Sequence, residues 1–325
     1  MPTSVPVNTA LTVAVCSIGR PDLFRALSLI AADDTSLIAE LIVVDNTGGS
    51  MDREAVAEAV GSLPVRVLDG PGPAAVGRNL ALSQARTDVV LFFDDDCLPE
   101  PGWATEMAAY MSAEPEVAAG FGRVEPVPLP NWRLGSEVVP LLGENAWGEV
   151  ETPDGDLWCP AVSGPSWQPG VYTGPPTIPV SVVGSSNNLA LRRSLLLPDR
   201  PVFLPHLGPG TAPASGEDTE LGYALMREGR KVAYVPQAKM VHNSWLGTDR
   251  AEQKMRCYLR GNVEALGYHA LRGDDHAARL LAAYLGQFRV GNGRGLDEFG
   301  DIFAWGYGSL TGGTAGTSSR QAESG

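Results

Sequence analysis

The chain has 325 residues, 44% of them hydrophobic and 19% charged, which is enough apolar material for a large core in one or two domains. Its net charge of −14 disfavours a nucleic-acid groove and electrostatic adhesion to an anionic membrane. No apolar run reaches the roughly 18 residues of a transmembrane helix, and the first ten residues lack the layout of a secretory signal. The four cysteines form no CxxC pair, which argues against a thiolate zinc site. We therefore expect a cytoplasmic protein.

The first hundred residues alternate short apolar runs with amphipathic stretches. Four of the runs are predicted strands: residues 11–17, 41–44, 65–68 and 89–93. Three stretches between them are predicted helices: one beginning at Pro21, one over 52–60 and one over 76–85. Strands separated by helices favour parallel pairing with helices on both faces of the sheet. The predicted fold class is α/β.

The composition changes near Val124. Residues 126–179 hold eleven of the 26 prolines and four tryptophans, and proline at that density prevents long helices and central strands. Regular patterns return further on: strands at 180–183 and 232–235, a helix over 218–228, and helical sequence over 248–288 punctuated by Gly261, Gly267 and Gly273. The tail over 308–325, rich in glycine, serine and threonine, is expected to be disordered.

Acidic residues follow two of the predicted strands, at Asp45 and at 94–96. Ligands of open α/β sheets bind at these carboxyl ends. Three adjacent carboxylates repel one another, and a divalent cation such as Mg²⁺ or Mn²⁺, which also binds diphosphate oxygens, relieves that repulsion. An acidic turn in solvent is the alternative, but the fully apolar strand before Asp94 favours a metal site. Upstream, Arg78 and Asn79 at a helix start form a weaker candidate for anion binding.

Four segments, in this order, resemble the family 2 glycosyltransferases of the GT-A fold. They are CSIGRP at 16–21, GRN at 77–79 before LFFDDDCLP at 91–99, GSSNNLA at 184–190, and GEDTE at 216–220. The resemblance spans about 11–243. It implies a Rossmann-like, mostly parallel sheet, and an enzyme that moves one sugar from a nucleotide-diphosphate sugar, in the first place a UDP-sugar, to an acceptor hydroxyl with inversion at the anomeric carbon.

The resemblance also implies roles for the acidic residues. Asp96 would hold the cation with Asp94 or Asp95 assisting, and Asp94 and Asp95 would also contact the nucleotide, Asp94 through the ribose hydroxyls. Asp45 would accept an N–H of the base, which suits uracil, thymine or guanine. His242 follows a predicted strand; a structural role and a role as third metal ligand both remain open.

Asp218 and Glu217 have two readings. Residues 215–218 fit an [ST]-x-x-[DE] helix cap, in which the acids interact with the helix dipole. The resemblance instead makes Asp218 the general base that takes the proton of the acceptor, with Glu217 as the backup.

The resemblance has limits that bear on the substrate. The family's polysaccharide synthases carry membrane helices and a QxxRW motif, which this sequence lacks, so transfer of a single sugar is favoured over polymer synthesis. Residues 124–179 have no counterpart in the family's common core, and their tryptophans either pack that insertion or contact the acceptor, a glycan, lipid-linked sugar or small aglycone. Those tryptophans are Trp132, Trp147, Trp158 and Trp167.

The expected organisation follows: a flexible N-terminus at 1–10, a glycosyltransferase domain over 11–247 with the insertion at 124–179, a helical extension over 248–307, and the tail. The extension offers an apolar face that packs on the main domain or forms a homodimer, at Met255, Leu259, Leu280 and Leu285. Two other functions stay open. A sugar nucleotidyltransferase needs a richer glycine and lysine or arginine loop after the first strand than 17–20 provides, and a non-catalytic carbohydrate-binding protein has no need of Asp94, Asp96 and Asp218.

Overall fold

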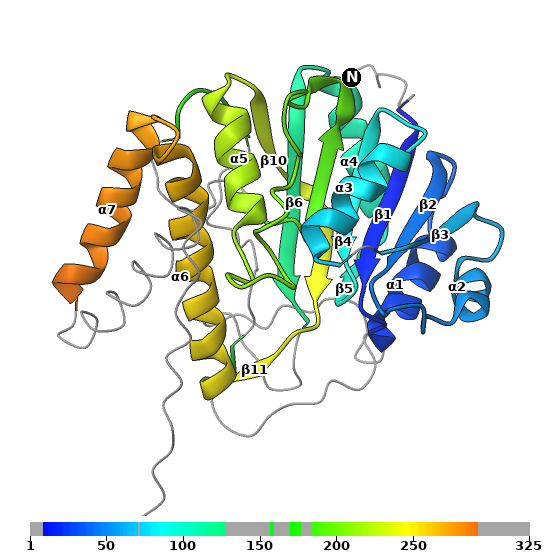
Figure 1. Cartoon of the computed structure of the whole chain (residues 1–325). Helices are drawn as coiled ribbons and strands as arrows, with labels where there is room; N and C mark the ends of the chain where they lie inside the picture. The colour runs from blue at the N-terminus through cyan, green and yellow to red at the C-terminus, as the bar shows by residue number, and fades with distance from the viewer. Residues whose placement is uncertain (1–8, 71, 128–156, 159–169, 177–183, 292–325) are drawn as a thin grey trace, which may run out of the picture.

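The computed structural model describes residues 9–70, 72–127, 157–158, 170–176 and 184–291. Their framework is a nine-stranded sheet between two layers of helices (Figure 1). The strand order is β3-β2-β1-β4-β9-β6-β10-β5, and β8 pairs with β10. The α/β class predicted from the alternating pattern is confirmed.

The first four main strands form the parallel part of the sheet. They are β1 (Leu11–Ser17), β2 (Ile38–Asp45), β3 (Val65–Asp69) and β4 (Val89–Asp94). The helices between them are α1 (Pro21–Ala32), α2 (Arg53–Val60) and α3 (Ala74–Gln84). Proline at the first position of α1 and the Asp52 side chain, which accepts N–H bonds from Glu54 and Ala55 of α2, fix two of these helix starts. All four predicted strands and all three predicted helices of this region are present.

The second half adds antiparallel pairings that the alternation of strands and helices does not predict. Strand β9 (Asn188–Arg192) lies between β4 and β6 (Val117–Pro126) and is antiparallel to both. Strand β10 (Lys231–His242) runs parallel to β6. Two short strands pair antiparallel with β10: β5 (Cys97–Pro99) and β8 (Gly170–Tyr172). A separate ribbon joins β7 (Leu157–Trp158) to β11 (Leu246–Gly247).

Each face of the sheet has its own apolar core. Val13 and Val15 of β1 point to the face covered by α1, α2 and α4 (Trp103–Ala113). Ala14 points to the other face, where α3 and α5 (Glu217–Arg227) pack, and both helices lie in front of the sheet in Figure 1. This alternation along one strand is the period-2 pattern of a sheet buried on both sides.

Two long helices follow the sheet and lie beside α5: α6 (Thr248–Ala270) and α7 (Asp275–Gly291) (Figure 1). Tyr223 of α5 packs with Leu266 and Leu280 in a small core between these helices. The sequence predicted that Gly261 and Gly267 would interrupt the helical stretch, but α6 runs through both glycines without a break. A Cβ on Gly261 would lie 2.5 Å from the backbone of Ser215, so this glycine serves close packing of α6 on the start of α5.

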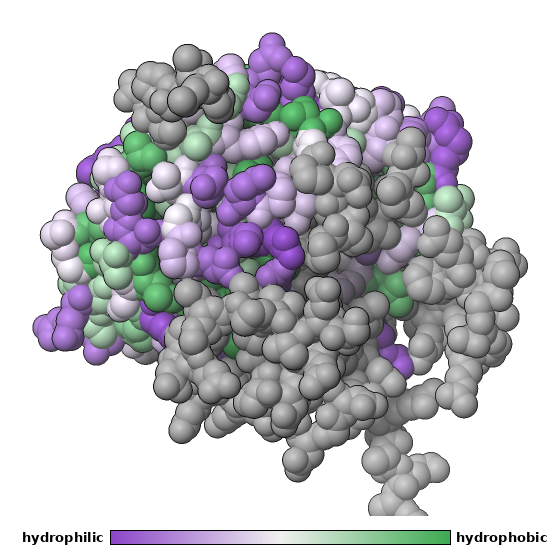
Figure 2. Space-filling view, turned by 180° about the vertical axis from the view of Figure 1, so that it is seen from behind, coloured by the Kyte–Doolittle hydropathy of each residue, from purple (hydrophilic) through white to green (hydrophobic). Residues whose placement is uncertain are grey.

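Several predictions fall outside the described residues: the strand at 180–183, the side chains of the four insertion tryptophans, and the tail. Within the described residues, β6 extends through Pro126. The start of the expected insertion, at Val124, therefore belongs to the sheet. Among the described helices none is both long and apolar enough to cross a membrane. The described surface seen from behind mixes hydrophilic and hydrophobic residues (Figure 2).

Candidate active site

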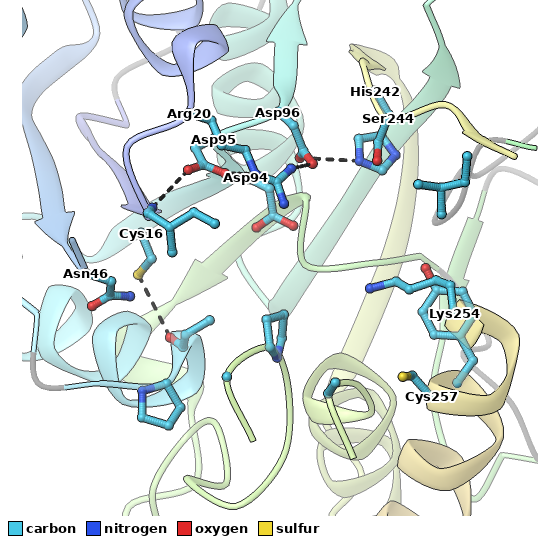
Figure 3. Close-up of a pocket in the computed structure, with 18 of the residues that line it drawn as sticks. Cys16, Arg20, Asn46, Asp94, Asp95, Asp96, His242, Ser244, Lys254 and Cys257 are labelled. Atoms are coloured by element: carbon cyan, nitrogen blue, oxygen red, sulfur yellow. Dashed lines mark hydrogen bonds and ion pairs between the residues drawn. The ribbon is translucent and has the colours of Figure 1, made fainter. Parts of the chain in front are cut away.

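A cavity of about 780 Å³ lies at the carboxyl ends of β1 and β4. Figure 3 shows the three consecutive acids and His242 along one side of it, and Lys254 and Cys257 of α6 on the other. Cys16 and Asn46, which lie beside the ends of β1 and β2, line a third part. The position agrees with the rule that ligands bind outside the carboxyl ends of strands in open α/β sheets.

Asp96 and His242 are brought together by the pairing of β5 with β10, which sets Cys97 opposite His242. The His242 Nε2 lies 3.3 Å from Asp96 Oδ1, and both residues are buried. The Cys97 thiol completes a group of three potential ligand atoms that lie within 4.8 Å of one another. Carboxylate oxygens suit both Mg²⁺ and Mn²⁺, whereas an imidazole nitrogen is a ligand of transition metals, so this pair fits Mn²⁺ better than Mg²⁺. Sequence reasoning missed Cys97, since its nearness to His242 depends on strand register.

Asp95 is held by the loop that follows β1. Its Oδ2 accepts hydrogen bonds from Ser17 Oγ at 2.7 Å and from the Ile18 N–H at 3.0 Å. Arg20 lies 3.5 Å from the other oxygen of Asp95 and also pairs with Asp96. Burial raises the pKa of Asp95, while these donors oppose the rise. The carboxylate of Asp95 therefore anchors the 17–20 loop to the acidic cluster.

Arg78 bridges the acidic cluster and the start of α5. Its Nη2 lies 2.7 Å from Asp94 Oδ1 and its Nη1 lies 2.9 Å from Glu217 Oε1, although Arg78 and Glu217 are 139 residues apart in sequence. The side chains of Arg78 and Glu217 are only 3% and 5% exposed. Burial and the neighbouring Asp218 raise the pKa of Glu217, and Arg78 acts against that rise. Arg78 is thus occupied by two carboxylates, and the second oxygen of Asp94 still faces the cavity side.

Asp218 lies beside this bridge in the first turn of α5. Its Oδ2 accepts the N–H of Ser186 at 3.2 Å, so the 184–190 segment and the GEDTE segment meet at this residue. Of the two interpretations of 215–218, the structure does not support the helix cap by Ser215: the residue before the helix is Gly216, with φ of 98° and no side-chain cap. The first carboxylates of α5 are therefore not used as a capping box. Asp218 is partly exposed and is not among the residues that line the cavity.

The remaining candidates differ in their surroundings. Asp45 is buried; its Oδ1 accepts from the N–H and hydroxyl of Thr47, and its Oδ2 has no donor within the described structure. Asn79 does not line the cavity, because its amide bonds the backbone of Phe203 twice, donating to the carbonyl at 2.6 Å and accepting the N–H at 3.0 Å. Of the candidates, the structure places five in the cavity lining, namely Arg78, Asp94, Asp95, Asp96 and His242. The other four, Asp45, Asn79, Glu217 and Asp218, are not among the residues that line it.

Residues 13–159 match the family model described as glycosyl transferase family 2. Two solved structures share the fold, each at 17% sequence identity. Mannosyltransferase PcManGT from Pyrobaculum calidifontis, in complex with GDP-Man and Mn²⁺, has a TM-score of 0.52, and the match covers 93% of this chain and 81% of that one. TarS 1-349 from S. aureus has a TM-score of 0.55, and the match covers 93% of this chain and 80% of that one. TarS 1-349 in complex with UDP-GlcNAc is 16% identical, with a TM-score of 0.53 over 93% and 81%. No curated protein sequence matches the chain.

Proposed function

We propose a reaction for this chain. Its residues 13–159, which match the family model, identify it as a glycosyltransferase of family 2, and its fold is GT-A. In the proposal it transfers one sugar from a nucleotide-diphosphate sugar, in the first instance a UDP-sugar, to an acceptor hydroxyl in a single inverting displacement that depends on a divalent cation. The observation that carries the proposal is the pairing of Asp96 with His242 at the edge of a cavity that Asp94 shares.

Asp96 and His242 are the proposed cation ligands, and the free oxygen of Asp94 is available either to the cation or to a ribose hydroxyl. The bound cation would neutralise charge on the departing diphosphate. Arg20 and Arg78 hold the three consecutive carboxylates in place, because each of these arginines pairs with part of the cluster. Three carboxylates are thereby kept close together without leaving all of their charge uncompensated.

Asp45 is the proposed contact to the base. Thr47 fixes one carboxylate oxygen by two hydrogen bonds, and the other oxygen is a buried acceptor to which no described group donates. Buried acceptors are normally satisfied, so this one fits an N–H donor from a ligand. Uracil and guanine both offer such a donor, and two of the solved structures with this fold are complexes with GDP-Man and with UDP-GlcNAc.

Asp218 is the proposed general base. An acceptor hydroxyl becomes a good nucleophile only as its proton is removed, and a carboxylate opposite the leaving diphosphate provides for that removal. Glu217, the backup candidate, is buried and tied to Arg78. We therefore assign Glu217 to positioning and Asp218 to proton transfer.

A thermal-unfolding screen tests the proposal. UDP-, GDP- and dTDP-sugars should each be added with Mg²⁺ or Mn²⁺ and with EDTA. A bound donor at a hundredfold excess over its Kd stabilises the fold by about 2.7 kcal/mol, so one base should raise the Tm, and only with the cation. Asp96→Asn should abolish that rise.

The matched control is Asp69→Asn, at the end of β3, the edge strand that β2 and β1 separate from β4. Its carboxylate is 85% exposed and, among the described residues, pairs with the surface residue Arg53. It should respond to donor and cation as the unaltered protein does. Donor stabilisation that is equal in EDTA, or equal in Asp96→Asn, would contradict the cation site.

A further inference from the structure

The α6 side of the cavity is basic, in contrast to the acidic side that faces it. Arg250 and Lys254 both line the cavity from the first two turns of α6, and the Lys254 side chain points into it (Figure 3). The Lys254 ammonium lies 5.2 Å from the centre of the Tyr258 ring, which also lines the cavity. Neither Arg250 nor Lys254 forms an ion pair with any carboxylate among the side chains that the structure describes.

The folded chain by itself does not favour cations at these two positions. Arg250 is the third residue of α6, and positive charge in the first turn of a helix interacts unfavourably with the helix dipole. Like charges four residues apart on one helix also repel. The acids across the cavity already have cations of their own, Arg78 for Asp94 and Arg20 for Asp95 and Asp96. A bound anion is what would compensate Arg250 and Lys254.

The course of α6 indicates which anion this is. Gly261 of α6 packs against Gly216, next to the proposed base at Asp218. Lys254 is seven residues earlier, about 10 Å along the helix axis at 1.5 Å per residue. The basic pair therefore lies on the helix that flanks the proposed base, to which the acceptor hydroxyl must come close. The proposed cation ligands Asp96 and His242 come from the turn between β4 and β5 and from β10, on the other side of the cavity (Figure 3).

We propose that the acceptor is anionic, and that Arg250 and Lys254 bind a phosphate or carboxylate group that it carries near the hydroxyl to be glycosylated. The proposal rests on the proposed function, since it assumes that the donor occupies the acidic side. Arginine offers a planar fork that matches two oxygens of such a group, and lysine adds a compact charge.

The test is a calorimetric titration of inorganic phosphate, and separately of acetate, at constant ionic strength. The titrated protein is the full chain saturated with the cation and with UDP, GDP or dTDP, whichever raises its Tm, so that the diphosphate position is already filled. At least one of the two anions should bind. Arg250→Gln and Lys254→Gln should each weaken it about tenfold, the effect of one hydrogen bond to a charged group, and change the nucleotide Kd by less than twofold.

Arg256→Gln is the matched control, because Arg256 is exposed on the same helix and does not line the cavity. It removes the same charge and should leave anion binding unchanged. The proposal is overturned if neither anion binds the nucleotide-saturated protein, if the control weakens binding equally, or if the two variants weaken nucleotide binding as much as anion binding, which would make the pair part of the diphosphate site.

Failure of the proposed function has a different signature, namely that none of the three nucleotides raises the Tm with the cation. The anion titrations are then made on the free protein with the same three variants. A tenfold loss of anion affinity confined to Arg250→Gln and Lys254→Gln would still support the anion site, and equal affinity in all variants would overturn it.

Discussion

Replacing Arg78 with leucine tests the buried bridge between the acidic cluster and α5. The substitution keeps most of the buried volume but leaves Glu217, with a side chain only 5% exposed, without its cation. Breaking a buried ion pair by removing one partner costs about 3–5 kcal/mol, since the other charge stays buried and uncompensated. Asp94 is 33% exposed and regains water in the variant, so we expect the lower end, about 3 kcal/mol.

This destabilisation should depend on pH in a defined direction. Burial and then Asp218 raise the pKa of Glu217, and Arg78 opposes them, so the leucine variant should raise that pKa further. When a carboxyl has a higher pKa in the folded than in the unfolded state, the free energy of unfolding falls as pH rises from the unfolded-state pKa through the folded-state pKa. Below both pKa values the carboxyl is protonated in both states and does not change the free energy of unfolding. The loss of stability should therefore be larger at pH 8 than at pH 5.

Urea unfolding followed by tryptophan fluorescence measures the effect. A loss of about 3 kcal/mol moves the midpoint by about 1 M for a chain with an m-value of about 3 kcal/mol/M. Arg53→Leu, which breaks an exposed pair with Asp69, is the control and should cost less than about 1 kcal/mol. Adding Glu217→Gln to Arg78→Leu should restore part of the lost stability, because no charge is then left buried. A midpoint shift in Arg78→Leu no larger than that of the control, or one larger at pH 5 than at pH 8, would refute the reasoning.

Three further substitutions separate chemistry, base binding and loop anchoring. Asp218→Asn should lower kcat by about 10² to 10⁴ in a radiolabelled-sugar transfer assay, with nucleotide Kd and Tm nearly unchanged; a kcat within threefold of the original removes this residue from proton transfer. Asp45→Asn should weaken nucleotide binding by about tenfold in calorimetry, because Thr47 retains the remaining oxygen and an NH₂ group then faces the base; an unchanged Kd would contradict the base contact. Asn79→Ala should cost about 2 kcal/mol in urea unfolding through two lost hydrogen bonds to Phe203 and spare nucleotide affinity, and the reverse pattern would return Asn79 to nucleotide binding.

The parallel half of the sheet was predictable because its signals are local. Runs such as 89–93 are uniformly apolar, and proline or aspartate marks the helix starts that follow or precede them. Strand β6 was missed because its sequence contains glycine, which normally weakens a strand. The structure gives the reason for Gly122: a Cβ there would lie 2.5 Å from the carbonyl oxygen of Ala238. The need for glycine at this position comes from a contact with a residue more than a hundred positions away in the sequence. The sequence around Gly122 therefore carries no pattern that would reveal it.

The candidate site divides in the same way. The acids were found because they follow strands, and strand ends are local features of the sequence. The partners of those acids were not found. That Arg78 pairs with Glu217, and that Cys97 faces His242, follows from the packing of α3 on the sheet and from the register of β5 on β10. The four-residue cap pattern at 215–218 failed for the converse reason, since the contact of Gly216 with Gly261 fixes the local backbone.

The charges of the cavity connect these separate observations. A protein with a net charge of −14 repels an anionic substrate at long range, but salt screens that repulsion beyond about 8 Å at physiological ionic strength. What the substrate meets inside the cavity is therefore set by the nearest groups. On the acidic side, Arg20 and Arg78 already offset part of the charge of the three carboxylates, and the proposed divalent cation would offset more of it and so reduce the repulsion of a diphosphate. On the α6 side no described carboxylate offsets Arg250 or Lys254. In the proposed reaction the nucleotide sugar would use the cation-bound acidic side of this cavity, and the anionic acceptor would use Arg250 and Lys254 on the α6 side.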